Sequence, residues 1–464
     1  MNDRGPSGTS VAERLARRAA GGDPLRIALI GAGKFGTMIL SQLRRLPGVE
    51  LAVLADLDAG RAVTAAERAG WERGRFVATD RAGAVNDVVR GGRTAVVTDG
   101  EVAASAAVDL VIEATGNVEA GALHAYRAIQ ASHDVVMVTV EADVVVGPLL
   151  QRMAAHNGVV YSMAYGDQPA LICELVDWAK TCGFEIVAAG KGTKFLPAYR
   201  RSTPDDWYVH YGFTPEEVER GGLNGRMFNS FLDGTKSAIE MVAVANATGL
   251  DVSDRGLSFA PVEPEQLART LIPAAAGGIL SSSGMLDVVT CVRDDGTFLP
   301  NHLRWGVYVT FTTDDLYTRQ CWHEYGISTD PSGVYAAFWR PYHFIGLEIG
   351  VSIGSVALDR RPTGAPFAGP RGEVVCASRT PLRAGQTIDG EGGYAVYGLS
   401  VSADLARRDA LVPLGLATGL RLKRDLGADH LIGYGDLEAP EESAFAWKLR
   451  REQERTFEPP KSLA

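Results

Sequence analysis

Three glycines stand at positions 31, 33 and 36, and their spacing is that of a turn that can hold phosphate groups. Gly31 permits a tight turn, Gly33 lets the backbone approach a pyrophosphate, and Gly36 lets a helix pack closely on a strand. The first turn of that helix would offer free N–H groups and a partial positive charge to the phosphates. Since 53 glycines in 464 residues make this spacing common by chance, the neighbouring segments must decide.

The segments around these glycines stand in the order that a dinucleotide-binding unit requires. An apolar run from Leu25 to Ile30 predicts a buried strand, and Thr37 to Leu46 predicts a helix. A second apolar run, Val49 to Ala55, ends in Asp56, where an acid would accept a hydrogen bond from a ribose 2′-hydroxyl. A purely structural glycine turn is the alternative. We predict that NAD(P)(H) binds at Gly31, Gly33, Lys34, Phe35, Gly36 and Asp56.

Polar residues follow later strands, at the sheet edge where the glycine turn is expected. Thr115 and Gly116 would face the nicotinamide or its ribose, unless they form a simple strand-to-helix turn. Glu141 is a candidate to hold a substrate hydroxyl or a metal ion, or else an ordinary acid at a helix N-terminus. Asp167 precedes a helix, so it either caps that helix or contacts the substrate.

Two lysines, Lys191 and Lys194, lie on a glycine-containing turn that follows the predicted strand from Phe184 to Ala189. Two cations on one turn can hold a carboxylate or a phosphate, and they are conspicuous in a chain of net charge −10. The alternative is a pair of exposed loop lysines. We predict that Lys191 and Lys194 bind the anionic group of a substrate.

A mostly apolar helix predicted from Phe228 to Thr248 carries one narrow polar stripe. The stripe consists of Asn229, Asp233, Lys236 and Glu240. If it lines a cavity, Lys236 could polarise a carbonyl or pass a proton, and the two acids would tune the pKa of Lys236. Asn229 would then bind substrate. The alternative is a solvated face held by ion pairs at spacings of three and four residues.

The elements that position these residues predict an α/β fold with several domains. From 25 to 162, short apolar runs alternate with helical stretches, as in a doubly wound parallel sheet of Rossmann type. Longer helices and mixed strands from 163 to 359 predict an α+β domain for substrate and dimerisation. A proline- and glycine-rich linker leads to a small β-rich module at 372–437. We expect residues 1–24 to form a flexible tail or a short amphipathic helix, and 438–464 to form a partly disordered tail.

Composition excludes several classes of function. An acidic chain with a pI near 5.4 argues against binding to nucleic acid or to anionic membranes. The longest apolar run is interrupted by Glu141 and Asp143, so we expect no membrane span. Five cysteines without a Cys-x-x-Cys pair predict reduced thiols and a cytoplasmic location. The first 24 residues lack the apolar region of a secretory signal.

These motifs resemble the homoserine-dehydrogenase-like NAD(P)-dependent oxidoreductases that carry a C-terminal SAF domain. The resemblance extends from Leu25 to Leu437, with the module after Gly372 similar to the SAF domain. Its motifs are the segments 30–36, 55–58, 113–116, 166–169, 190–194, 233–236, 392–398 and 412–415.

The branch that this architecture resembles is that of the 1-deoxy-D-xylulose 5-phosphate reductoisomerase-like (DRL) enzymes, which rearrange and reduce a sugar phosphate with NADPH and usually a divalent metal. The resemblance implies that Lys191, Lys194, Asn229, Asp233 and Lys236 hold the phosphate and the polyol. In homoserine dehydrogenases the corresponding helix supplies an acid and a lysine that polarise the reacting carbonyl.

Two departures from this resemblance bear on activity and cofactor. Glu141 stands where homoserine dehydrogenases have a lysine, which argues against plain homoserine oxidation. Asp56 would repel the 2′-phosphate of NADP, although Arg61 could offset that repulsion.

We therefore predict an NAD(P)-dependent oxidoreductase that acts on a small phosphorylated or carboxylated hydroxy or keto substrate, with or without isomerisation. A non-catalytic dinucleotide sensor and a simple alcohol or aldehyde dehydrogenase are the alternatives. The predicted partners are the substrate and further copies of the chain, in a homodimer or a higher homo-oligomer. The need for a metal stays open.

Overall fold

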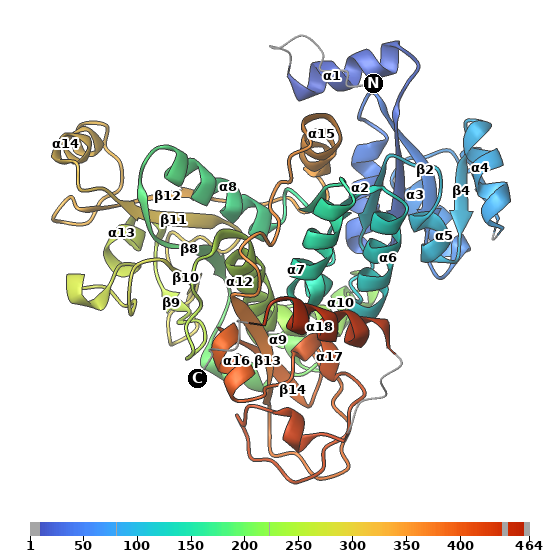
Figure 1. The fold of residues 1–464 in the computed structure, drawn as a ribbon. Coiled ribbons are helices and arrows are strands. Elements are labelled where there is room, and N and C mark those ends of the chain that lie inside the picture. Colours follow the sequence, from blue (N-terminus) through green and yellow to red (C-terminus); the bar gives the residue numbers. More distant parts are fainter. Residues whose placement is uncertain (1–9, 80, 222, 439–443, 459–464) are drawn as a thin grey trace. The chain divides into compact units, whose positions relative to one another are not determined.

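The computed structural model describes residues 10–79, 81–221, 223–438 and 444–458. The chain is an α/β protein with a seven-stranded parallel sheet of Rossmann type, a five-stranded mixed sheet and a two-stranded antiparallel sheet (Figure 1). This confirms the predicted fold class. The chain divides into two compact units, here called the first unit (1–170, 344–365 and 444–464) and the second unit (171–343 and 366–443). The predicted domain ranges stay predictions.

The first unit contains the parallel sheet, with strand order β3-β4-β2-β1-β5-β6-β7. Its central strand β1 is buried at every residue except Arg26, as the apolar run predicted. Because β1 lies between β2 and β5, the strand order changes direction here, and a dinucleotide binds at such a point. The strands are β1 (Leu25–Ile30), β2 (Val49–Ala55), β3 (Phe76–Ala78), β4 (Thr94–Val97), β5 (Leu110–Glu113), β6 (Asp134–Met137) and β7 (Tyr161–Met163).

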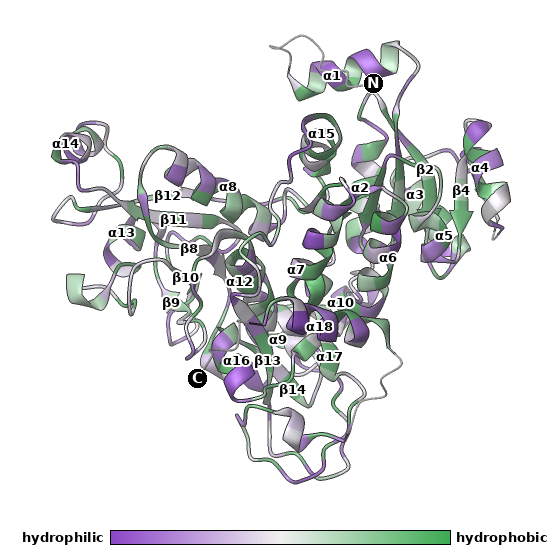
Figure 2. Cartoon of the chain, in the orientation of Figure 1, coloured by the Kyte–Doolittle hydropathy of each residue, from purple (hydrophilic) through white to green (hydrophobic). Residues whose placement is uncertain are grey.

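Helices cover this sheet, and α2, α3 and α15 share one hydrophobic core with it. Green, hydrophobic residues fill strands β2 and β4 in Figure 2, while α4 carries both hydrophobic and hydrophilic residues. The helices of the first unit are α1 (Val11–Ala20), α2 (Lys34–Leu43), α3 (Ala59–Arg68), α4 (Ala82–Arg90), α5 (Gly100–Ala104), α6 (Val118–Gln130), α7 (Val140–His156), α15 (Ile349–Asp359) and α18 (Phe445–Thr456), with the 3₁₀ turn η1 (Arg73–Arg75).

Helix α7 begins at Val140 and continues through Pro148, although a proline more often starts or breaks a helix. Glu141 therefore lies in the first turn of α7 and not at a strand end. The side chain of Gln453 in α18 donates to the carbonyl of Val145 and accepts the N–H of Leu149, at 3.0 and 3.1 Å. These bonds satisfy backbone groups around the proline, which cannot itself donate.

The end of the chain is also more ordered than predicted. Residues 445–456, placed in a disordered tail by their charge, form α18 and pack against α6 and α7. At its start, the N–H groups of Phe445 and Ala446 donate to the carboxylate of Glu119.

The second unit contains the mixed sheet, with strand order β12-β11-β8-β10-β9. Strand β11 is antiparallel to β8 and β12, whereas β10 is parallel to β8 and β9. The strands are β8 (Glu185–Thr193), β9 (Ala260–Pro261), β10 (Met285–Thr290), β11 (Val307–Thr312) and β12 (Tyr335–Arg340). A separate antiparallel pair, β13 (Gly372–Ser378) and β14 (Val396–Ser402), forms the sheet of the C-terminal module, a name used here for residues 372–437.

The chain passes from the first unit to the second within α8. Helices α12 and α13 contact strands of the mixed sheet, and α12 also contacts β13 and β14. The helices are α8 (Gln168–Thr181), α9 (Trp207–Tyr211), α10 (Pro215–Gly221), α11 (Gly225–Leu232), α12 (Thr235–Thr248), α13 (Leu267–Thr270), α14 (Leu316–Glu324), α16 (Ala403–Arg408) and α17 (Leu414–Ala417), with the 3₁₀ turns η2 (Pro197–Arg201), η3 (Pro264–Gln266), η4 (Ala274–Ala276) and η5 (Tyr434–Asp436).

The single helix predicted from Phe228 to Thr248 is wrong. The chain forms two helices, α11 and α12, which are separated by Asp233 and Gly234. Gly234 has a φ of +88°, a left-handed conformation that interrupts a right-handed helix. The polar stripe is therefore divided between two helices, with Asp233 at the junction.

Candidate functional site

The glycine turn of the first unit has the close backbone contacts that its sequence predicts. Gly31 has a φ of +102°, and a Cβ there would lie 2.5 Å from the carbonyl oxygen of Ala114. A Cβ on Gly36 would lie 2.0 Å from the carbonyl oxygen of Gly31, whereas one on Gly33 would meet nothing within 4 Å. The turn thus leaves open space above Gly33, at the N-terminus of α2, where a pyrophosphate can approach the backbone.

The carboxylate of Asp56 fixes this turn to the end of β2. It accepts the N–H of Ala32 at 2.9 Å and that of Asp58 at 3.2 Å, and Arg61 donates to it at 2.5 Å. Burial raises the pKa of Asp56, but these donors outweigh burial and hold that pKa below its ordinary value. The side chain of Arg61 is 62% exposed, so its charge also faces solvent beside the turn.

Thr115 and Gly116 lie at the same sheet edge, because Ile30 of β1 is in register with Glu113 of β5. The Thr115 hydroxyl donates to Glu113 at 2.6 Å, and the N–H of Gly116 donates to Thr139 at 2.9 Å. Both residues therefore help to build the strand-to-helix turn, which was the alternative weighed for them. Their contact with a nicotinamide stays a prediction.

Glu141 and Asp167 are also placed in the first unit. Glu141 lies half-buried in the first turn of α7, where the helix N-terminus favours a negative charge. Asp167 is buried and accepts the N–H of Gln168, the first residue of α8. Both positions fit the acids at helix starts that were weighed as alternatives, and their roles toward a substrate stay predictions.

Asp143 is a buried acid that the sequence interpretation noted only as a break in an apolar run. It accepts the hydroxyl of Tyr161 at 2.8 Å, and its other oxygen has no partner among the residues that the structure describes. Burial raises the pKa of Asp143 to about 7, although the Tyr161 hydrogen bond opposes this. An acid next to a run of valines was the available signal.

In the second unit, the side chains of Lys191 and Glu240 form a buried ion pair with each other. Strand β8 extends to Thr193, so Lys191 is a buried strand residue, and its ammonium group pairs with the Glu240 carboxylate of α12. The two charges neutralise each other within the fold. Lys191 thus lies in a strand and not on the predicted turn, it is not the exposed loop lysine weighed as the alternative, and Glu240 has a partner other than Lys236.

Asp233 and Asn229 are also held by specific partners. Asp233 forms a buried ion pair with Arg379 of the C-terminal module, at 2.5 Å. Asn229 donates to the carbonyls of Ser202 and Gly392, and accepts the Ser202 hydroxyl at 2.6 Å. Lys236 is half-buried in the first turn of α12. Asn229, Asp233 and Glu240 of the stripe are therefore held in polar contacts within the fold, not spread along a solvated face.

Lys194 has a second cation nearby that sequence reasoning missed. Its ammonium group lies 5.3 Å from the ring centre of Phe298 and 5.6 Å from that of Tyr211, and the Arg304 guanidinium lies over the same rings at 5.9 and 5.6 Å. Burial and the nearby Arg304 charge both lower the pKa of Lys194. Arg304 stands 110 residues further along the chain, so spacing carried no signal.

This pair of cations has no acidic counterpart in the part of the chain that the structure describes, where neither forms an ion pair with a carboxylate. Lys194 donates to the carbonyl of His210. Two positive charges beside aromatic rings, without a neutralising acid, form a site that can bind an anionic group.

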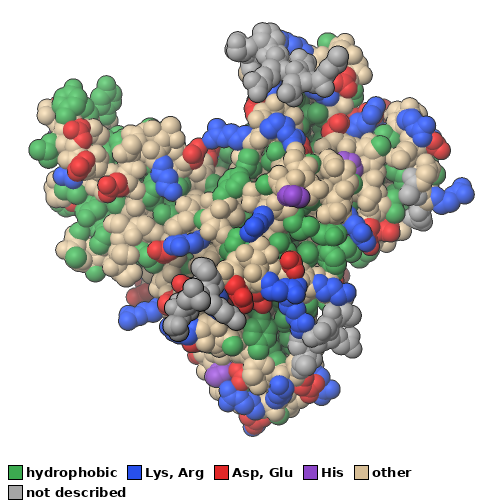
Figure 3. All heavy atoms as spheres, viewed as in Figure 1, with side chains coloured by type: hydrophobic (Ala, Val, Ile, Leu, Met, Phe, Trp, Pro, Cys, Tyr) green, Lys and Arg blue, Asp and Glu red, His purple; other side chains and the backbone are tan. Residues whose placement is uncertain are grey.

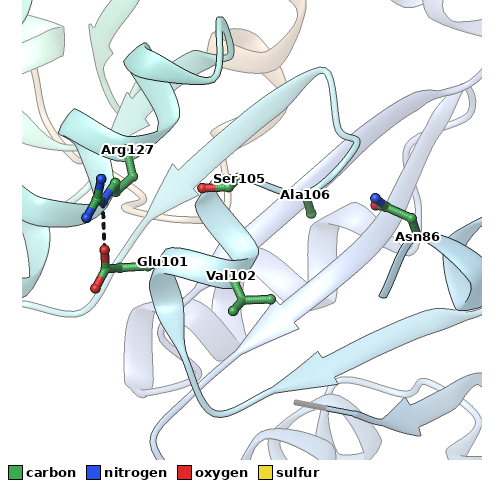
Figure 4. A pocket seen from close by; sticks show the side chains of 6 residues that line it. All are labelled: Asn86, Glu101, Val102, Ser105, Ala106 and Arg127. Atoms are coloured by element: carbon green, nitrogen blue, oxygen red, sulfur yellow. Dashed lines mark hydrogen bonds and ion pairs between the residues drawn. The ribbon is translucent and has the colours of Figure 1, made fainter. Parts of the chain in front are cut away.

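The remaining features of the described structure do not involve the predicted site residues. A cavity of about 320 Å³ in the first unit is lined by α4, α5, α6 and the loop after α5, and none of its residues was predicted to act (Figure 4). The Arg127–Glu101 ion pair, at 2.6 Å, lies at its wall. Within the described ranges, no group of three or more His, Cys, Asp or Glu residues is placed to hold a metal ion. None of the described helices is both long and apolar enough to cross a membrane.

Comparisons with known proteins add a family match. Residues 166–349 match the family model described as oxidoreductase DRL, catalytic domain. No curated protein matches the chain.

The solved structures that match the chain include a reductoisomerase and a probable dehydrogenase. The 1-deoxy-D-xylulose 5-phosphate reductoisomerase from Zymomonas mobilis, in complex with NADPH, is 14% identical, over 72% of this chain and 82% of that one, with a TM-score of 0.34. A probable dehydrogenase from Thermotoga maritima is 13% identical, over 74% and 92%, with a TM-score of 0.37. From the family match, together with the glycine turn and parallel sheet of the first unit, we conclude that the chain is an NAD(P)-dependent oxidoreductase.

Proposed function

We propose that the chain transfers a hydride between NAD(P)(H) and the carbonyl or hydroxyl carbon of a small phosphorylated or carboxylated substrate. The observation that carries this proposal is the glycine turn, with the open space at Gly33 and the Asp56 carboxylate bonded to Ala32. The match of residues 166–349 to an oxidoreductase catalytic domain supports it.

The charge balance at the end of β2 supports use of NADP(H) as well as NAD(H). A free carboxylate at Asp56 would repel a 2′-phosphate, but here the Arg61 guanidinium donates to that carboxylate and partly neutralises it. Arg61 remains largely exposed and has further N–H donors that a 2′-phosphate could accept from.

On the substrate side, we assign the anionic group to Lys194 and Arg304, because Lys191 is neutralised by Glu240. The nicotinamide supplies or takes the hydride. Lys236 would donate a proton to the carbonyl oxygen during reduction and take it back from the hydroxyl during oxidation. Asp233 would then act through its charge on Lys236.

The test measures turnover of NADPH and NADH by the full chain against phosphorylated and carboxylated hydroxy and keto compounds. Lys236→Met should lower kcat by about 100-fold while the Kd for NADPH stays unchanged. Lys180→Met, at an exposed position of the second unit, is the matched control and should keep full activity. NADPH binding without turnover of any compound would instead favour the dinucleotide sensor.

Whether isomerisation accompanies reduction is decided by the product. A rearranged carbon skeleton, seen by NMR, would support a reductoisomerase. An unchanged skeleton would support a simple alcohol or aldehyde dehydrogenase. The proposed test therefore separates the two reactions within the same class.

We further propose that the chain acts as a homodimer or a higher homo-oligomer. Hydrophobic atoms gather over α14 in Figure 3, where Leu316 and Tyr317 are about three-quarters exposed, at 76% and 73%. Such an apolar patch is typical of an interaction surface. Light scattering of the purified chain tests this, and a monomer at all concentrations would contradict it.

A further inference from the structure

The side chain of Arg379, directly after β13, is buried at a point where three segments of the second unit meet. Its guanidinium donates to the Asp233 carboxylate at 2.5 Å, to the carbonyl of Val396 at 2.9 Å and to the carbonyl of Arg200 at 2.7 Å. The side chains of Arg379 and Asp233 are 1% and 0% exposed. Because water does not screen this pair, removing either side chain would leave the other charge buried without its partner.

The carboxylate of Asp233 has a different partner on each oxygen. One oxygen accepts the N–H of Thr235, in the first turn of α12, at 2.9 Å, and the other accepts from Arg379. Gly234, between them, has the left-handed conformation that breaks the helix. The direction of the carboxylate is therefore set by α12 on one side and by the C-terminal module on the other.

Other bonds join the module to the same two helices. The N–H of Gly398 donates to the Thr235 hydroxyl at 2.7 Å. The Ser230 hydroxyl donates to Glu391 at 2.5 Å, and Asn229 donates to the carbonyl of Gly392 at 3.0 Å. Segment 391–398 of the module thus contacts α11 and α12, while Arg379 contacts their junction. These helices carry Asn229, Asp233 and Lys236 of the candidate site.

The electrostatics of the pair show what Arg379 contributes. Burial raises the pKa of Asp233, and the charge and hydrogen bond of Arg379 oppose that rise. Without Arg379, a buried carboxylate would have to lose its charge or move toward water. Tyr211 is another titratable side chain that the Asp233 charge reaches, and Lys236 and Glu240 are the charged residues of α12.

We propose that Arg379 is a positioning residue for the oxidoreductase reaction, which holds Asp233 in place beside the first turn of α12 and makes the C-terminal module part of the catalytic unit. This inference rests on the proposed function through the role of Asp233. It assigns a role to the module, which lies outside the matched catalytic-domain residues 166–349.

The experiment compares five variants of the full chain with the wild type: Arg379→Met, Arg379→Lys, Asp233→Asn, the double variant of Asp233→Asn and Arg379→Met, and Arg383→Met. The last is the matched control, because Arg383 forms an exposed ion pair with Asp425 in the same module, at 2.8 Å. For each variant, kcat and KM are measured against pH, NADPH binding is titrated, and thermal unfolding checks the fold.

We expect Arg379→Met to lower kcat by about 100-fold, with the Kd for NADPH unchanged and the acidic limb of the kcat profile moved to higher pH. Arg379→Lys should recover at least about a tenth of the activity, since it restores a positive charge without the fork geometry. Arg379→Met should have little further effect in the Asp233→Asn background, because both changes remove the same interaction. Arg383→Met should match the wild type.

Three outcomes would overturn the inference: an Arg379→Met variant that keeps kcat within about threefold, an equal loss in both backgrounds, or a loss that only follows the melting temperature. If Arg379→Met does not fold, the Arg379→Lys variant decides through its kcat and pH profile. A wild-type chain that binds NADPH but turns over no compound would overturn the proposed function. Wild-type turnover that survives Arg379→Met overturns only the present inference.

Discussion

Single residues in this chain carry charges whose environment decides what they can do. Asp143 is the clearest case in the first unit, since its carboxyl is buried in α7 and only one oxygen has a partner among the described residues. Its pKa of about 7 lies above the value of an unfolded chain, about 3.9. As pH rises, the unfolded chain gives up this proton first, so stability contributed by the neutral carboxyl is lost between about pH 4 and pH 7.

Asp143→Asn removes this titration while keeping an oxygen that can accept from Tyr161. We expect the variant to be more stable than the wild type at about pH 8 by roughly 1–3 kcal/mol, after the cost of burying the amide N–H₂. At about pH 5 the stability gain of the variant over the wild type should be less than half of its value at about pH 8. Urea unfolding at the two pH values measures it, with exposed Asp87→Asn as the control. If the wild type is more stable than Asp143→Asn at about pH 8, the raised pKa of Asp143 is refuted.

Arg61 is the residue that we expect to decide between the two cofactors. Arg61→Ala removes a cation from the turn and leaves Asp56 without its neutralising partner, so the repulsion of a 2′-phosphate should rise. We expect the KM for NADPH to increase by about tenfold and that for NADH to change by less than about twofold. Steady-state kinetics with both cofactors test this, and exposed Arg68→Ala on the same helix is the control. Equal changes for both cofactors would contradict the prediction.

At the residue scale, the sequence predicted the turn and its acid but not the ion pairs. The turn at Gly31 and the acid at Asp56 could be predicted because strand, turn, helix and acid follow one another closely along the chain. Glu240 lies 49 residues from Lys191, and Arg379 lies 146 residues from Asp233. Neither pair leaves a pattern in a single sequence, since only the tertiary fold brings the partners together.

Helices and strands depart from the prediction where one glycine or proline changes the backbone. The apolar pattern continues from α11 into α12, and so it predicted one helix, although α12 is buried along most of its length and α11 is not. Gly234 breaks it through a positive φ that periodicity cannot show. Pro148 is the opposite case, because a proline more often starts or breaks a helix, whereas this one lies inside α7.

Gly234→Ala tests the element that separates the two helices. A Cβ at this position would take an unfavourable φ of +88° and lie 3.0 Å from the ring of Phe259. We expect a loss of about 1–3 kcal/mol of unfolding free energy. Gly427→Ala, where a Cβ meets open space in the same unit, should change stability by less than about 0.5 kcal/mol. Equal stabilities of the two variants in denaturant unfolding would show that Gly234 is not required.

At the scale of the molecule, the two units are not consecutive in the chain. The chain passes between them at residues 170–171, 343–344, 365–366 and 443–444. Alternation of apolar and helical stretches predicted the parallel sheet, because each strand and helix pair is local. The return of α15 and α18 to the first unit could not be predicted, since periodicity does not record which distant segment covers a helix.

A variant in α18 tests whether this last helix stabilises the first unit. Gln453→Ala removes the amide that bonds to Val145 and Leu149 around Pro148, and leaves buried backbone groups with lost partners. We expect a loss of about 1–3 kcal/mol in the unfolding free energy of the first unit, whereas exposed Glu452→Ala should be close to neutral. Hydrogen exchange of α7 should rise in the first variant alone. Unchanged exchange would mean that α18 does not support α7.

The discontinuous first unit also has a consequence for protein synthesis. Ile349, Ile353 and Val356 of α15 belong to its core, and α18 packs on α6 and α7. A ribosome must therefore translate most of the messenger RNA before the cofactor-binding sheet receives all the helices that cover it. Until then the nascent chain exposes part of this apolar core, so we expect the first unit to depend on chaperones more than the continuous order of its strands suggests.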